Sequence, residues 1–306
     1  MPQSASSLRS RLWYCIAARL HRWAQGQGQL TFQHFTMLLT SARGIHNRGV
    51  SALLTGCLLA AVAVAACTPA ATSPTSDKAL TVAAAADLQF AFAELGELFQ
   101  KETGTKVTFL FGSSGTLAQQ IENGAPVDIF ASADDEYVYR LAAKGMVIPE
   151  TEQPYAVGRI ALVASKSSGP RIATLQDLLQ PEVRHIALAN PDHAPYGVAA
   201  KQALESAGLW ERLQPRVVYG ENVRQALQFV QTGNAEGGIV ALSIADVPEV
   251  SFVLLDESLY QPLRQLLVVV EGTRREALAR QFAALVNSPE GRPVMARYRF
   301  VLPGER

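Results

Sequence analysis

Cysteine is scarce in this chain of 306 residues, and its three copies, Cys15, Cys57 and Cys67, all fall within the first 67 positions. The rest of the chain therefore has no disulfide and no thiol chemistry. Histidine is scarce there too, because only His185 and His193 follow the last cysteine, and they lack the spacing of metal ligands. These absences argue against thiol catalysis, a disulfide scaffold and a histidine metal site.

Acidic residues are missing from the first 76 positions, although this stretch holds six arginines: Arg9, Arg11, Arg19, Arg22, Arg43 and Arg48. A charge-free run over residues 52–66 follows and ends in small residues next to Cys67. A basic flank, a short apolar run and small residues at the processing point are typical of a secretory signal. The run is too short to span a membrane, since that takes about 20 apolar residues. We therefore expect residues 1–66 to be a leader.

The cysteine that ends this leader has two interpretations. It matches a bacterial lipoprotein signal, in which Cys67 is lipidated and becomes the mature N-terminus. The alternative is ordinary cleavage at or near Ala66, which leaves a protein without an anchor. We favour lipidation, with residues 67–77, rich in Thr, Ser, Pro and Ala, as the lipidated cysteine and a flexible tether. Because Met37 begins a more ordinary signal, residues 1–36 are candidates for a misassigned start.

The remaining part, roughly 230 residues, is long enough for one large or two modest domains. It carries 21 basic residues against 27 acidic ones, a net charge of about −6, because six of the chain's 27 lysines and arginines lie in the leader. Such a balance gives no basic surface for nucleic acid, so we expect no nucleic-acid partner. A bound anion must be held by local geometry, since the overall field is weakly repulsive.

Short apolar runs alternate with amphipathic stretches along this part, which is typical of an α/β fold with mainly parallel sheets. Near residues 155–165 a loop and an apolar run indicate a crossover into a second lobe. We expect a first lobe over 78–156 and 245–306 and a second lobe over 157–244. The segments 251–255 and 265–270 are expected to return to the first lobe.

Four turns at expected helix starts carry the functional prediction: Ala86-Asp87-Leu88, Gly112-Ser113-Ser114-Gly115-Thr116, Ala194-Pro195-Tyr196-Gly197 and Gly220-Glu221-Asn222-Val223. A helix start presents unpaired backbone N–H groups and the positive end of the helix dipole. Several helix starts that meet at one point therefore form an anion site. One such turn alone is only a helix cap.

The candidate residues in these turns differ in what they can donate. The hydroxyls of Ser113, Ser114 and Tyr196 can donate hydrogen bonds to an oxyanion. Val223 offers only its backbone N–H, which is a useful group if the ligand is an oxyanion. Each also has a structural interpretation, because serine is a preferred N-cap and tyrosine can simply pack against its loop.

Catalytic alternatives find less support. No lysine follows Gly115, which argues against a nucleotide P-loop, and the residues around Ser113 and Ser114 do not form a nucleophile elbow. The acidic cluster over 134–136 is at an expected helix start, where carboxylates complement the dipole. A phosphate-ester hydrolase with Ser114 as the nucleophile stays an alternative, but it needs a general base or a metal that the sequence does not convincingly offer.

Assembled, these motifs resemble the periplasmic molybdate-binding proteins of ABC importers, which have the type II binding-protein topology. The resemblance covers nearly all of residues 78–302. Its most specific pieces are 84–88, 111–117, 120–130, 132–134, 195–197, 221–223 and 238–243. It implies two α/β lobes, each a mainly parallel sheet flanked by helices, that close on a tetrahedral oxyanion held by hydroxyls and backbone amides.

Carried over by motif, the resemblance implies that the oxygens of molybdate contact Asp87, Ser114, Tyr196 and Val223. Many members have Ser or Thr where this chain has Asp87, and a carboxylate repels a dianion. We therefore expect the Asp87 side chain to turn back onto the helix amides, leaving its own N–H or that of Leu88 for the ligand. Some members place a tyrosine hydroxyl where this chain has Ala241, and here Tyr196 is expected to replace that donor.

The resemblance implies a receptor in the periplasm or cell envelope, lipid-anchored at Cys67, that captures molybdate and also tungstate. It would deliver the ion to a membrane permease with its ATPase. We expect a monomer, no cofactor and no catalysis. The alternative within transport is a receptor for sulfate, phosphate or another oxyanion on the same fold.

Overall fold

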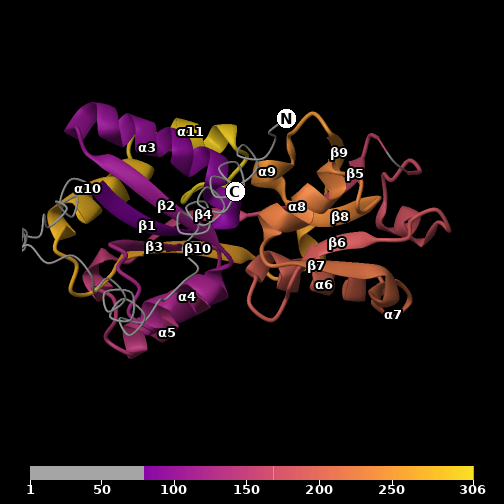
Figure 1. Cartoon of the computed structure of the whole chain (residues 1–306), viewed down its shortest axis with the longest axis horizontal. Helices are drawn as coiled ribbons and strands as arrows, with labels where there is room; N and C mark the ends of the chain where they lie inside the picture. The colour runs from indigo at the N-terminus through magenta and orange to yellow at the C-terminus, as the bar shows by residue number, and fades with distance from the viewer. Residues whose placement is uncertain (1–78, 168, 306) are drawn as a thin grey trace, which may run out of the picture. The chain divides into compact units, whose positions relative to one another are not determined.

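The computed structural model describes residues 79–167 and 169–305 (Figure 1). The expected leader over 1–66, the lipidation site Cys67 and the tether lie outside the described residues. The described part is an α/β structure with two five-stranded mixed sheets, ordered β2-β1-β3-β10-β4 and β7-β6-β8-β5-β9. No helix in the described ranges is long and apolar enough to cross a membrane.

The first sheet has three parallel strands, β1, β2 and β3, while β10 runs antiparallel to both β3 and β4. Its strands are β1 (Ala79–Ala85), β2 (Lys106–Gly112), β3 (Ile129–Ser132), β4 (Gln153–Gly158) and β10 (Leu263–Val269). Helices cover both of its faces, so apolar residues on both sides of β1 and β3 are buried. Figure 1 shows two groups of helices on opposite faces, α3 (Gln89–Thr103), α10 (Glu276–Val286) and α11 (Gly291–Arg297), and then α4 (Ser114–Glu122) and α5 (Asp135–Ala143).

The second sheet is built the same way, with β6 parallel to β7 and β8, and β5 antiparallel to β8 and β9. Its strands are β5 (Ile160–Ser165), β6 (Ile186–Ala189), β7 (Val217–Gly220), β8 (Gly237–Ala241) and β9 (Val250–Leu254). Its helices are α6 (Pro195–Ser206), α7 (Trp210–Leu213), α8 (Val223–Gln231) and α9 (Leu242–Ala245). Short 3₁₀ turns complete the elements: η3 (Ala86–Leu88), η4 (Pro149–Thr151), η5 (Leu175–Leu179), η6 (Gln214–Arg216) and η7 (Glu257–Leu259). Below, a lobe means one sheet with the helices named for it.

Strand β9 corrects one expectation. Residues 251–255 were expected in the first lobe, but β9 pairs with β5, with Leu254 opposite Ala161, and so belongs to the second sheet. The chain returns to the first sheet only at β10. The sequence does not distinguish the two sheets here, because a half-exposed edge strand has the same pattern beside either of them. The lobe boundaries as residue ranges stay a prediction.

The order of elements places four helix starts at the carboxyl ends of parallel strands. Strand β1 leads into η3 and α3, β2 into α4, β6 into α6, and β7 into α8. Ligands of open α/β sheets bind outside the carboxyl ends of the strands, where helix N-termini point toward them. Both lobes therefore present their helix starts at the edge where a ligand is expected.

A cluster of aromatic rings stabilises the first lobe. Phe282 of α10 is fully buried, and its ring centroid lies 5.7 Å from that of Phe92 and 5.4 Å from that of Phe99, both on α3. Both contacts are edge-on, the arrangement that aromatic pairs favour. The cluster joins α10 to α3, so two segments far apart in the chain share one core.

We predict that Phe282→Ala lowers the free energy of unfolding by about 3–5 kcal/mol, because it removes a fully buried ring and leaves a cavity. Leu110→Ala, at a side chain 42% exposed, is the control and should cost less than about 1 kcal/mol. Urea unfolding followed by circular dichroism measures both. Equal losses in the two variants would contradict the assignment of this cluster as a core.

Candidate anion-binding site

A small cavity lies where the four helix starts meet. Its lining comes from the ends of β1 and β2, from the residue after β3, and from the first residues of η3, α4, α6 and α8. The residues are Ala85, Ala86, Asp87, Gly112, Ser113, Ser114, Ala133, Ala194, Pro195, Tyr196, Asn222 and Val223. The space open to the centre of a water-sized sphere is about 10 Å³, enough for about one such sphere. Five of the six predicted site residues thus surround one point, drawn from both lobes.

Leu88 is the exception. It is fully buried in the apolar core and is not among the residues that line the cavity. The residue before it, Asp87, does line the cavity. The sequence suggested the backbone N–H of either Asp87 or Leu88 as a donor to the ligand. The N–H of Asp87 is therefore better placed for that role.

The start of α4 contributes one hydroxyl whose hydrogen is available. Ser114 is fully buried, and its Oγ accepts the backbone N–H of Ala133 at 2.9 Å. That bond uses a lone pair and leaves the hydroxyl hydrogen for a ligand. The neighbouring Ser113 is different, because its hydroxyl donates to Oγ1 of Thr116 at 2.8 Å. Ser114 is therefore the better donor of the two.

The start of α8 explains the valine. Asn222 is the N-cap, and its side-chain oxygen accepts the N–H groups of Arg224 at 3.0 Å and Gln225 at 3.1 Å. The cap does not take the N–H of Val223, the first residue of the helix. This is one of the donors that a helix start leaves without an intrahelical partner. Val223 is 3% exposed and lines the cavity.

The start of α6 works in a similar way. Ala194 at its N-cap makes no side-chain capping bond, and Pro195 has no N–H to donate. The first backbone donor of this helix is therefore the N–H of Tyr196, on a residue that lines the cavity. The small or apolar side chains of Ala194, Pro195 and Val223 leave the backbone accessible to a ligand.

The Asp87 side chain contradicts the sequence expectation. It accepts no hydrogen bond from an amide of α3, since both bonds to its Oδ2 come from side chains and its Oδ1 has no partner among the described residues. Instead its Oδ2 accepts the hydroxyl of Tyr196 at 2.9 Å and Nε2 of Gln265 at 2.8 Å. The physical reason is that a carboxylate only 1% exposed is stabilised by strong donors, and these come from elements 109 and 178 positions away. Tyr196 therefore gives its hydroxyl hydrogen to Asp87 here.

Burial also changes the protonation of this pair. It raises the pKa of Asp87 from 3.8 to about 6, and the hydrogen bonds from Gln265 and Tyr196 offset only part of that effect. Burial, followed by the nearby carboxylate, raises the pKa of Tyr196 well above its usual value of 10.0. The phenol therefore keeps its proton at any physiological pH and acts as a donor.

Sequence reasoning missed two polar residues that hold Asp87. Gln265 is fully buried in β10, and Ser243 of α9 donates its hydroxyl to the backbone oxygen of Asp87 at 2.9 Å. One signal was present: Gln265 interrupts an otherwise apolar run in a buried strand, and buried polar side chains need partners. Gly158 completes this region, because a Cβ there would meet the Tyr196 hydroxyl and the Gln265 amide.

Direct contacts join the two lobes beside the cavity. The backbone N–H of Gly115 in α4 donates to the backbone oxygen of His193 at 2.9 Å, and Oγ of Ser113 lies 2.8 Å from Nδ1 of the same histidine. A Cβ on Gly115 would approach His193 O to 2.7 Å, so only glycine allows this contact. Glu221 lies 3.8 Å from His193 Nε2 but is 80% exposed, so this ion pair contributes little.

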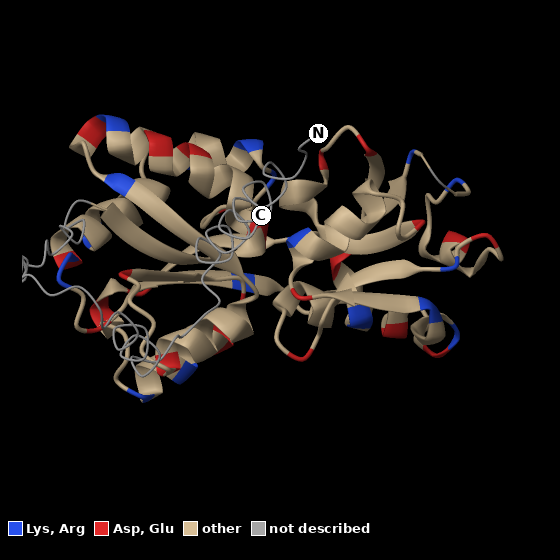
Figure 2. Cartoon of the chain, in the orientation of Figure 1, with Lys and Arg blue, Asp and Glu red and all other residues tan. Residues whose placement is uncertain are grey.

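Charged groups do not surround the cavity. No lysine, arginine or histidine lines it, and Asp87 is its one charged residue. Figure 2 shows acidic and basic residues of both signs scattered over helices and loops. No group of three or more His, Cys, Asp or Glu residues that could hold a metal ion occurs among the described residues. The arrangement suits a small anion held by neutral donors.

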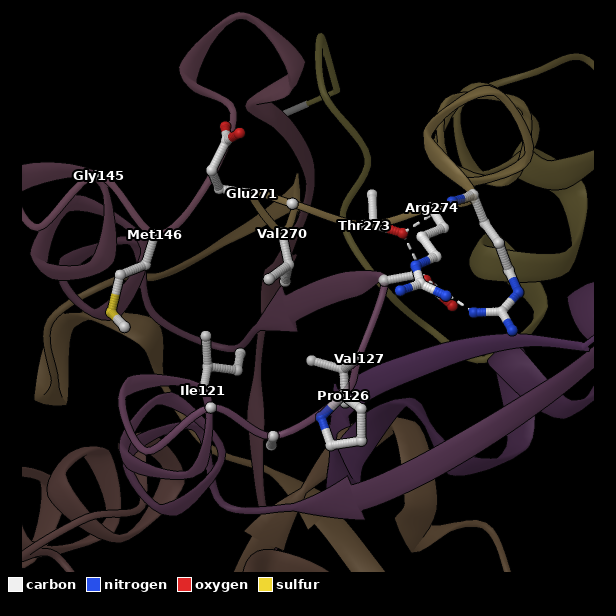
Figure 3. A pocket seen from close by; sticks show the side chains of 14 residues that line it. Ile121, Pro126, Val127, Gly145, Met146, Val270, Glu271, Thr273 and Arg274 are labelled. Atoms are coloured by element: carbon white, nitrogen blue, oxygen red, sulfur yellow. Dashed lines mark hydrogen bonds and ion pairs between the residues drawn. The ribbon is translucent and has the colours of Figure 1, made fainter. Parts of the chain in front are cut away.

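A larger cavity of about 480 Å³ lies at the opposite edge of the first sheet (Figure 3). Its lining includes Ile121, Val127, Val270 and Arg274. Asp128 at its margin already accepts the N–H of Thr81 at 2.7 Å and the Thr273 hydroxyl at 2.5 Å. This cavity is at the amino ends of β1 and β3, away from the four helix starts, and its lining combines the Asp128 carboxylate with two arginines, Arg274 and Arg275. We therefore assign the anion site to the smaller cavity.

The fold and the site together define a solute-binding protein with two lobes around a small cavity. The family model described as bacterial extracellular solute-binding protein matches residues 80–301, and the chain belongs to this family.

The most similar relatives include molybdate-binding proteins. The chain is 32% identical over 229 residues to the molybdate-binding protein ModA of Rhodobacter capsulatus, covering 74% of this chain and 90% of the relative. It is 30% identical over 249 residues to YvgL of Bacillus subtilis, named a putative ABC transporter substrate-binding lipoprotein, covering 79% and 95%. The solved periplasmic molybdate-binding protein of Azotobacter vinelandii superposes with a TM-score of 0.68 at 32% identity, covering 73% and 99%. These relatives are binding proteins. The sequence analysis likewise predicts a binding protein and not an enzyme.

The raised pKa of Asp87 predicts a pH dependence of stability. A carboxyl whose pKa is higher in the folded state favours folding when protonated, so its contribution is lost as the pH rises from about 4 to about 6. Asp87→Asn should remove this loss. Relative to the variant, the wild type should lose up to about 3 kcal/mol of unfolding free energy over that range. Chemical denaturation at several pH values measures this, and parallel profiles for the two proteins would contradict it.

Proposed function

We propose that this chain is the substrate-binding protein of an ABC importer and that it captures molybdate in the cavity between its lobes. One observation carries the proposal: neutral donors from four helix starts surround one small cavity. Relatives named for molybdate binding, about a third identical over most of their length, support the same ligand.

The donors proposed for the ion are groups already in place. They are the hydroxyl of Ser114 and the backbone N–H groups of Asp87, Ser114, Tyr196 and Val223. A hydrogen bond to a charged group contributes roughly 1.5–3 kcal/mol. A handful of such bonds from a fixed frame supports useful affinity after the cost of association. The contacts are to the oxygens of the oxyanion, so the side chains do not need to coordinate the metal itself.

The size and charge of the site limit its ligands. The cavity admits the centre of only about one water-sized sphere, which favours a small inorganic anion over a phosphate ester or a carboxylic acid with a bulky organic part. With no lysine or arginine lining it, the site attracts anions only through its helix starts and hydroxyls, and shape decides which anion binds. Tungstate has the same charge and a similar shape, and we propose it as a second ligand. Sulfate and phosphate are the competing ligands.

A hydrolase that uses Ser114 is less well supported by the geometry. The histidine near the site contacts Ser113, and the hydrogen of that serine goes to Thr116. Ser114 itself accepts a backbone N–H, and no hydrogen bond joins its hydroxyl to a basic side chain among the described residues. A nucleophilic serine needs a base that takes its proton. Release of phosphate from a phosphate ester, measured with the purified protein, would overturn the binding-only proposal.

We also propose how the protein is placed and used. Lobe closure would trap the ion, and a membrane permease with its ATPase would recognise the closed form. The relative named a lipoprotein supports an anchor at Cys67 in the periplasm or cell envelope. We propose that the receptor acts as a monomer, because one chain supplies donors from both of its lobes.

A thermal-shift panel tests the ligand. A ligand that binds only the folded state adds RT ln(1 + [L]/Kd) to stability, about 2.7 kcal/mol at a hundredfold excess over Kd. Millimolar molybdate or tungstate should therefore raise the melting temperature by about 5–10 °C. Sulfate and phosphate should give much smaller shifts. Shifts with sulfate as large as those with molybdate would replace this ligand assignment by the sulfate receptor.

The Ser114→Ala variant tests the site. It removes one donor to the ion, so the affinity for molybdate should fall about 10- to 100-fold. The variant also leaves the N–H of Ala133 without its acceptor, so its fold is checked by circular dichroism. Ser251→Ala, at an exposed position on β9, is the matched control and should bind like the wild type. Calorimetric titration measures all three, and unchanged affinity in Ser114→Ala would show that the site is misplaced.

A further inference from the structure

The cavity contains an electrostatic conflict. Asp87 is 1% exposed and lines a site whose other lining residues are uncharged. Its Oδ2 accepts two hydrogen bonds, but its Oδ1 is buried and has no hydrogen-bond partner among the described residues. An ionised carboxylate there would repel a dianion in surroundings of low dielectric constant. The site therefore needs a way to remove this charge.

Counting hydrogens shows what the ionised form presents. Tyr196 has one hydroxyl hydrogen, and it points to Oδ2 of Asp87 at 2.9 Å. The Gln265 amide nitrogen also lies within reach of both partners, 2.8 Å from Oδ2 and 3.0 Å from the Tyr196 oxygen. With Asp87 ionised, the hydrogens of this cluster are shared internally, and Oδ1 offers only lone pairs. The cluster then has no hydrogen to give to an anion.

One added proton changes this balance. If Oδ1 carries it, the acid donates directly to an oxyanion. If Oδ2 carries it, the acid can donate to the Tyr196 oxygen, and the tyrosine hydrogen becomes free for the ligand. Either arrangement turns an acceptor-rich cluster into a donor and removes the negative charge. No bond other than the one to this proton forms or breaks, and solvent supplies the proton.

We propose that the site binds a dianionic oxyanion together with one proton, which is held by the cluster of Asp87, Tyr196 and Gln265. This inference rests on the proposed function, since it takes the cavity as an oxyanion site. Gln265 acts as a positioning residue, because its amide fixes both oxygens that share the proton. Ligand capture and proton uptake are then one coupled event.

The groups around Asp87 leave it as the one that titrates. Burial raises the pKa of Asp87 to about 6 before any ligand is present, and a dianion beside it raises that pKa further. From β4, Tyr155 faces it as a buried phenol with a pKa well above 10.0, and Tyr196 from α6 is another. The α9 hydroxyl on its backbone and the β10 amide are neutral.

Two basic side chains from the second lobe, Arg224 and His193, have other contacts. Arg224 of α8 lies over the ring of Phe90, 5.5 Å from its centroid. His193, from the loop before α6, contacts Ser113 instead. Neither is among the groups that shift the pKa of Asp87. A proton is therefore the available means of neutralising this carboxylate.

Calorimetric titration of the full-length protein with tungstate and molybdate tests the proposal between about pH 6 and about pH 8.5. In two buffers of different ionisation enthalpy, wild type should take up close to one proton per ion at the alkaline end. Its affinity should fall by up to about tenfold per pH unit above the pKa of the free site. Asp87→Asn, an uncharged variant of the same shape, should bind with little pH dependence and take up no proton. Asp256→Asn, an exposed acid away from the site, is the matched control and should behave like wild type.

The outcomes separate this inference from the proposed function. Tight binding of molybdate by wild type without proton uptake would overturn the inference and leave the function intact. No binding of molybdate or tungstate would overturn the function itself. Preference for hydrogen phosphate without proton uptake would overturn both, because the ligand would then bring its own hydrogen to an ionised Asp87. If Asp87→Asn does not fold, the proton count on wild type in the two buffers still decides.

Discussion

The structure depends on a set of backbone N–H groups that their own helices cannot use. At the starts of α4, α6 and α8, and at η3, the chain leaves donors without intrahelical partners, and both sheets direct them to one place. The capping groups of these helices leave the first N–H donors without a partner. Asn222 takes the second and third N–H groups of α8 and not the first, while Pro195 contributes none. Several side chains here are small or apolar, such as Ala86, Ala194 and Val223, which suits a site where the backbone supplies most donors.

Asp87 is the exception to that design. A single carboxylate among neutral donors costs desolvation energy, and the fold offsets it with a phenol from one lobe and an amide from the other. The hydrogen bonds that Tyr196 makes with Asp87 and Gln265 cross between the lobes, so they stabilise this arrangement of the lobes even without a ligand. When it is ionised, Asp87 weakens binding of the anion, but its hydrogen bond with Tyr196 stabilises the contact between the lobes.

Much of this arrangement follows from sequence pattern alone. The alternation of apolar runs and amphipathic stretches predicts two sheets with parallel strands, and turns rich in small residues predict that Ser114, Tyr196 and Val223 meet. Two features do not follow. The sheet that β9 joins depends on which edge is free, and a short exposed strand pairs with either. The partners of Asp87 depend on contacts across more than 100 positions, which local pattern does not encode.

The contact between Gly115 and His193 has a further consequence, because it is made entirely by main-chain atoms. Substitutions at neighbouring positions can reshape the pocket without touching the bond that joins its walls. Ligand selectivity and the contact that joins the lobes are therefore separable properties of this fold. Related proteins can exchange one inorganic ligand for another by changing a few side chains while keeping this main-chain bond between α4 and the loop before α6.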